Sequence, residues 1–184
     1  MFGYDMARLH AAVNDIPAAL LLASVLFDLL GAINKRDALK AAGFWCLVVG
    51  VLGAGAAVAT GLITEGRIDH TDRAHAAMET HELLSVIVTV LFALLLGWRL
   101  IRRGMWGEKE TPVALTAGVI GVALLVITAR LGGTLVFDHG LGVPTSTLRG
   151  IVEERGGGTF VPDSAAAADT SKSHRHADGT SHEH

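Results

Sequence analysis

Four long apolar runs constrain the fold of this 184-residue chain more than any other feature. They extend over about 16–33, 41–63, 83–101 and 113–129. Each is close to the roughly 20 residues that an α-helix needs to cross the hydrocarbon core of a bilayer. The runs lack the polar residues at every third or fourth position that a surface helix of a soluble protein carries. The sequence therefore predicts an all-α fold, an integral membrane four-helix bundle in a lipid bilayer.

The last part of the chain differs sharply in composition from the apolar runs. From about residue 151 it is rich in Gly, then in Ala and Ser, and it ends in SHRHADGTSHEH. A segment with so few apolar side chains cannot bury a core of its own. We therefore predict two parts, a four-helix transmembrane domain over 1–150 and a disordered, histidine-containing tail over 151–184.

Charges in the short connections predict the orientation of the bundle. Two connections carry an excess of basic residues, namely Lys35, Arg36, Lys40, Arg99, Arg102, Arg103 and Lys109. The opposite face is mostly acidic. Because Lys and Arg prefer the cytoplasmic side, both termini are predicted to lie outside a bacterial inner (cytoplasmic) membrane. The formal net charge of −3, without a basic stripe, argues against a nucleic-acid partner.

The predicted topology gathers the histidines on one side of the membrane. With four crossings, five of them fall on the outer face: His10, His70, His75, His81 and His139. We expect the glycine-rich segment RLGGTLVFDHGLGVP to form a turn that aims His139 back over the mouth of the bundle. Neutral imidazole binds haem iron, copper and zinc, so a ligand site is predicted there.

Three interpretations of this cluster remain open. Haem needs two axial histidines facing each other across a slot between helices, for which His81 and His139 are the first candidates and His10 the third. Arg130 is then a candidate partner of a haem propionate. A bare Cu, Zn or Fe ion would instead recruit carboxylates as well as imidazoles; its candidate ligands are His10, Asp15, His75, Glu79, His81 and His139. The third interpretation is ordinary surface histidine, which explains His70 best.

Asp28 is unusual because it lies inside an apolar run. A carboxylate there is costly and tends to face the bundle interior or a cavity. It is predicted to pair with Lys35 or Arg102. In the second run, Gly50/Ala54 and Gly53/Ala57 have the small-xxx-small spacing that lets helix backbones approach closely, which favours packing within the bundle.

Two segments, LHAAVNDIPAALLLASVLFDLLG and LGGTLVFDHGLGV, carry a family resemblance. They are similar to the bacterial membrane family called domain of unknown function 2231, and the resemblance covers approximately residues 8–143. It implies a four-helix membrane fold. Because some relatives are fused to Rieske iron–sulfur or c-type cytochrome domains, it also implies a redox setting.

The resemblance also matches individual positions. The matching residues are His10 for the first family histidine, Pro17 for a proline, Asp28 for an acidic residue late in the first helix, His75 or His81 for a histidine opening the third, and His139 for the last. One departure is that Asp15 stands where relatives carry a second histidine, which moves some weight toward a bare metal.

The leading hypothesis is an electron-transfer subunit that binds b-type haem near the outer face. It would pass electrons between a quinol, or a periplasmic cytochrome or iron–sulfur carrier, and a partner. The alternatives are a membrane protein that handles Cu, Zn or Fe with the same histidine cluster, and a cofactor-free structural or assembly subunit. A hydrolytic enzyme is disfavoured, because the chain has no Ser-His-Asp pattern, Walker loop or HExxH motif.

Overall fold

The computed structural model describes residues 2–66, 72–155, 173–175 and 181–183. Four long helices make up its first compact unit, Met1–Val143. Their bounds are α1 Phe2–Asn34, α2 Asp37–Glu65, α3 Asp72–Ile101 and α4 Thr111–Phe137. Each is long and apolar enough to cross a membrane. The predicted all-α membrane fold is confirmed.

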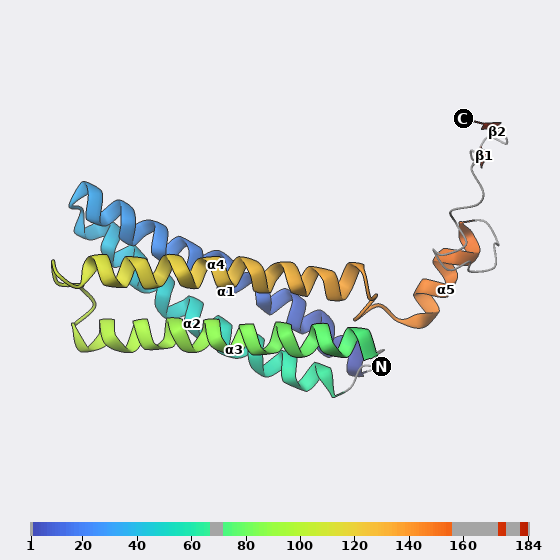
Figure 1. The fold of residues 1–184 in the computed structure, drawn as a ribbon, viewed down its shortest axis with the longest axis horizontal. Coiled ribbons are helices and arrows are strands. Elements are labelled where there is room, and N and C mark those ends of the chain that lie inside the picture. Colours follow the sequence, from blue (N-terminus) through green and yellow to red (C-terminus); the bar gives the residue numbers. More distant parts are fainter. Residues whose placement is uncertain (1, 67–71, 156–172, 176–180, 184) are drawn as a thin grey trace. The chain divides into compact units, whose positions relative to one another are not determined.

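The four helices lie alongside one another in alternating directions (Figure 1). Helix α1 packs on α2 and α4, and α3 packs on α2 and α4, so α1 and α3 are diagonal across the bundle. Much of the outward surface is formed by large apolar side chains, such as Leu52, Leu94 and Ile101, which are 68%, 67% and 81% exposed. An apolar exterior of this kind is stable against lipid tails and not against water.

The helices extend beyond the apolar runs at the end of the bundle where α2 ends and α3 begins. The first apolar run was predicted to begin at about residue 16, but helix α1 begins at Phe2 and continues through Pro17. His81 was expected to open the third helix, and it instead lies within α3. Hydropathy marks only the part of a helix that is surrounded by hydrocarbon, and a helix can continue past it into the interface. His10 and His81 therefore lie on rigid helices rather than in loops.

Small residues bring the backbones of neighbouring helices close together. A Cβ atom at Gly50 of α2 would lie 2.7 Å from Leu21 Cδ2 of α1, and one at Gly121 of α4 would lie 2.8 Å from the Phe92 ring of α3. Leu21 and Phe92 are both fully buried. The predicted close packing of the second run within the bundle is thus observed against α1.

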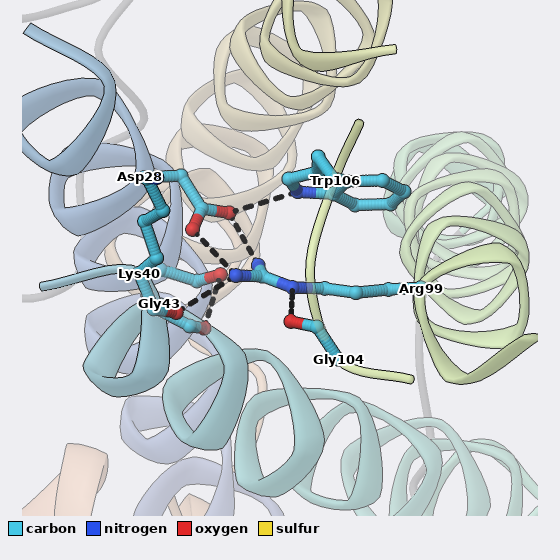
Figure 2. Close-up of polar contacts among 7 residues, drawn as sticks. Asp28, Lys40, Gly43, Arg99, Gly104 and Trp106 are labelled. Atoms are coloured by element: carbon cyan, nitrogen blue, oxygen red, sulfur yellow. Dashed lines mark hydrogen bonds and ion pairs between the residues drawn. The ribbon is translucent and has the colours of Figure 1, made fainter. Parts of the chain in front are cut away.

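A buried ion pair joins α1 to α3 at the end of the bundle where the α1–α2 and α3–α4 connections lie (Figure 2). The Arg99 guanidinium, which is 0% exposed, donates two hydrogen bonds to the Asp28 carboxylate. It also donates to the carbonyls of Lys40 and Gly104, at 2.7 and 3.0 Å. Trp106 Nε1 lies 3.5 Å from Asp28 Oδ2. The partner of Asp28 is therefore Arg99, and not Lys35 or Arg102 as predicted.

The second compact unit, Pro144–His184, contains the remaining described elements. They are α5 Thr145–Glu154 and two short strands, β1 Ser173–Arg175 and β2 Ser181–Glu183, which pair antiparallel. Helix α5 runs across the position predicted to separate domain from tail, and the strands were not predicted. Most of the predicted disordered tail falls outside the described residues.

Candidate functional site

A cavity of about 300 Å³ opens within the bundle at the end where α2 ends and α3 begins. All four long helices contribute to its walls, which are mainly apolar, with residues such as Leu21, Val88 and Leu125. Polar lining residues come from the helix turns nearest this end of the bundle: Arg8, Asn14, Thr64, Glu65 and Glu82. A concave, mostly apolar pocket with a few placed polar groups is typical of a cofactor or small-molecule site.

Two of the predicted site residues, His10 and His81, line this cavity. His10 comes from α1 and His81 from α3, the two diagonal helices. Both are partly buried, and both line the same cavity from opposite helices. The structure thus brings together two imidazoles that are far apart in the sequence.

Each imidazole is held by a backbone carbonyl on the next helix. His10 Nδ1 donates to the Ala57 carbonyl of α2 at 3.0 Å, and His81 Nδ1 donates to the Thr128 carbonyl of α4 at 3.0 Å. A carbonyl oxygen only accepts hydrogen bonds, so the proton of each neutral ring is on Nδ1 and the lone pair is on Nε2. Fixing the tautomer through Nδ1 in this way is how proteins orient histidines that ligate a metal through Nε2.

The Nε2 atoms of both rings make no hydrogen bond to any residue that the structure describes. In the same part of the chain, no fully buried side-chain nitrogen lacks a partner, so each Nε2 atom retains accessible surface, on a residue that lines the cavity. Two accessible imidazole lone pairs in an apolar cavity can bind an electrophilic metal centre.

The surroundings of the two histidines repeat at a constant spacing in the sequence. The second set lies 71 residues after the first: His10, Ala57 and Gly61 correspond to His81, Thr128 and Gly132. The Gly50–Leu21 and Gly121–Phe92 contacts obey the same spacing, and so do Asp28 and Arg99. Helices α1–α2 and α3–α4 therefore form two similar hairpins that run in the same direction, as in the parallel repeats of some membrane proteins.

The other predicted site residues lie away from the cavity. His139, Asp15 and Arg130 are exposed, and none of them lines it. Gly132 and Gly133, expected in a turn, belong to helix α4, and His139 follows shortly after its end. His75 lies 3.4 Å from Glu79 one turn later on α3, with both side chains largely exposed. His70 falls outside the described residues.

No group of three or more His, Cys, Asp or Glu side chains is placed to hold a metal ion, as far as the described residues extend. The predicted carboxylate ligands therefore do not join the histidines at one point. Sequence reasoning missed the carbonyls of Ala57 and Thr128 and the glycines at 61 and 132. The shared spacing of 51 residues from His10 to Gly61 and from His81 to Gly132 is the signal that could have indicated the repeat.

A comparison with known families decides the membership of the chain. The model of the family described as "Predicted membrane protein (DUF2231)" matches residues 7–145, which include most of α1, all of α2, α3 and α4, and both histidines. The chain belongs to this family. The family description assigns a membrane location and no activity. No curated protein and no solved structure matches the chain.

Proposed function

We propose that this member of the family is an electron-transfer subunit of the bacterial inner membrane, and that it holds b-type haem between His10 and His81. The observation that carries the proposal is the pair of equivalent imidazoles on diagonal helices, each with its Nδ1 proton on a carbonyl and its Nε2 accessible. When bound, haem supplies one-electron redox chemistry. His10 and His81 would hold the group through Nε2, and the chain supplies an apolar cavity around them.

The cavity supports haem better than a bare metal ion. A structural zinc site uses four protein ligands and a catalytic one uses three, whereas bis-histidine haem takes only two from the protein. Among the described residues, two histidines meet at the cavity and no third ligating side chain is grouped with them for a metal ion. The lining of Leu, Val and Ala side chains suits the apolar face of a porphyrin.

The position of the cavity sets the side of the membrane on which the proposed haem would exchange electrons. The basic connections, with Lys35, Arg36 and Lys109, would lie in the cytoplasm, so the cavity and both termini would face the periplasm. Haem there would be within reach of a quinol in the outer leaflet and of a periplasmic cytochrome or iron–sulfur carrier. The polar residues at the outer helix turns, among them Arg8 and Asn14, would meet the propionates.

Spectroscopy of the purified protein tests the proposal. The protein is expressed under haem-replete conditions, and its reduced-minus-oxidised spectrum is recorded alongside metal analysis. We expect a b-type α-band in the wild type, its loss in His10→Ala and in His81→Ala, and its retention in the matched control His139→Ala. Stoichiometric metal without porphyrin would instead support the metal-handling alternative. Neither haem nor metal in the wild type would support a cofactor-free subunit.

A further inference from the structure

Each of the two imidazoles lies against a glycine on the neighbouring helix whose carbonyl accepts its hydrogen bond. Gly61 lies one turn after Ala57 on α2, and Gly132 lies one turn after Thr128 on α4. A Cβ atom at Gly61 would lie 3.2 Å from His10 Cε1, and one at Gly132 would lie 3.1 Å from His81 Cε1. Both distances are shorter than ordinary van der Waals contacts between carbon atoms.

We propose that Gly61 and Gly132 are equivalent positioning residues, each of which seats one imidazole so that its Nε2 reaches the shared cavity. A seat consists of the carbonyl at position 57 or 128, which fixes the Nδ1 edge, and the glycine one turn later, which leaves room for Cε1. What the rings bind rests on the proposed function, but how they are seated does not.

Gly61 and Gly132 lower the stability of the helices that contain them. Glycine is among the poorest residues in a helix interior, and alanine is the best. Ala at either position would therefore favour the helix while pushing the ring away from its seat. The carbon between the two ring nitrogens is the atom that a methyl group would meet, so the ring has to turn. Turning it lengthens the Nδ1–carbonyl hydrogen bond and moves Nε2.

The chain offers matched controls on the same two helices. A Cβ atom at Gly55 of α2 or at Gly133 of α4 would have nothing within 4 Å. Gly133 directly follows Gly132, so Gly132→Ala and Gly133→Ala differ only in the direction of the added methyl group. On α2, Gly55→Ala is the corresponding control for Gly61→Ala. Any effect confined to 61 and 132 comes from the rings and not from glycine content.

Two measurements on the full chain test the proposal. First, ¹⁵N NMR of ligand-free protein labelled at histidine reports the protonation of Nδ1 and Nε2 in each ring. Gly61→Ala is expected to shift the His10 signals and leave those of His81, Gly132→Ala to do the reverse, and both controls to match the wild type. Second, in haem-loaded protein, both seat variants are expected to change the low-spin electron paramagnetic resonance signal, and the controls to preserve it.

The outcomes separate this proposal from the proposed function. If the wild type binds no haem but the NMR shifts follow the expected pattern, the seats are supported and the haem proposal fails. If the seat variants are indistinguishable from the controls by NMR, the seating proposal is overturned, whatever the wild type binds. Should Gly61→Ala prevent folding, the double variant His10→Ala/Gly61→Ala is measured. Recovery of folding there supports a clash with the ring, and its failure overturns the proposal.

Discussion

Removal of the Asp28 carboxylate should destabilise the bundle far more than removal of an exposed carboxylate. Arg99 is 0% exposed, and in the variant Asp28→Ala it would lose two of its four hydrogen bonds. The carbonyls of Lys40 and Gly104 remain as acceptors, and the rings of Phe44 and Trp106 remain 5.7 and 5.2 Å from its guanidinium carbon.

The expected magnitude follows from the burial of the charge. Breaking a buried ion pair by removing one partner typically costs about 3–5 kcal/mol, because the other charge is left uncompensated. The remaining carbonyls and rings place Asp28→Ala near the lower limit, at about 3 kcal/mol. Folded domains are stable by only about 5–15 kcal/mol, so the loss is large. Asp28→Asn keeps an acceptor for Arg99 and should lose less, about 1.5–3 kcal/mol.

The assay is equilibrium unfolding in mixed detergent micelles, followed by circular dichroism. The control is Asp37→Ala, which removes an ion pair to Lys40 of 2.9 Å whose carboxylate is 79% exposed. Exposed pairs contribute about 0–1 kcal/mol, so this variant should remain close to wild type. A double variant, Asp28→Leu/Arg99→Met, should recover most of the stability, because it leaves no buried charge. Equal losses in Asp28→Ala and Asp37→Ala would refute the reasoning.

Three further predictions concern other contacts. The Thr60 hydroxyl is a second acceptor for His10 Nδ1, at 3.2 Å. Thr60→Val removes this acceptor, so it should weaken His10 as a donor ligand and raise the reduction potential of bound haem. Redox titration measures the potential, and the exposed control Thr116→Val should show no such shift. Gly121→Ala should lower the free energy of unfolding by about 1–2 kcal/mol, because overpacking against Phe92 exceeds the gain in helix propensity. The control Gly97→Ala on α3 has open space around the added methyl group, so it should be neutral or stabilising. The pKa of Glu110 is lowered, first by a hydrogen bond from the Gly107 N–H and then by Arg102. The ionised carboxylate therefore stabilises the folded state at neutral pH, and this contribution is lost as the pH falls through the lowered pKa. The stability of Glu110→Gln should depend less on pH in the acid range than that of the wild type, and parallel pH profiles would contradict this.

The sequence alone determined the membrane fold and the end of the bundle where a site could form. Runs of about 20 apolar residues leave few alternatives to spanning helices, because backbone polar groups must pair internally in lipid. An even number of crossings then places His10 and His81 at the same end. Family membership was also predictable from the two motifs, and the family match over residues 7–145 confirms it.

The tertiary structure decided which residues meet. In the sequence, Lys35 is the basic residue nearest to Asp28, but the diagonal packing of α1 and α3 buries Arg99 against Asp28 and leaves Lys35 and Arg102 exposed. In the same way, five histidines were predicted to share one end, but the packed helices place only His10 and His81 at the cavity, while His139 is exposed past the end of α4. Hydropathy measures how apolar a segment is, and it carries no information on the rotation of one helix against another. Close contacts such as Gly61 with His10 set that rotation, and they exist only in the packed bundle.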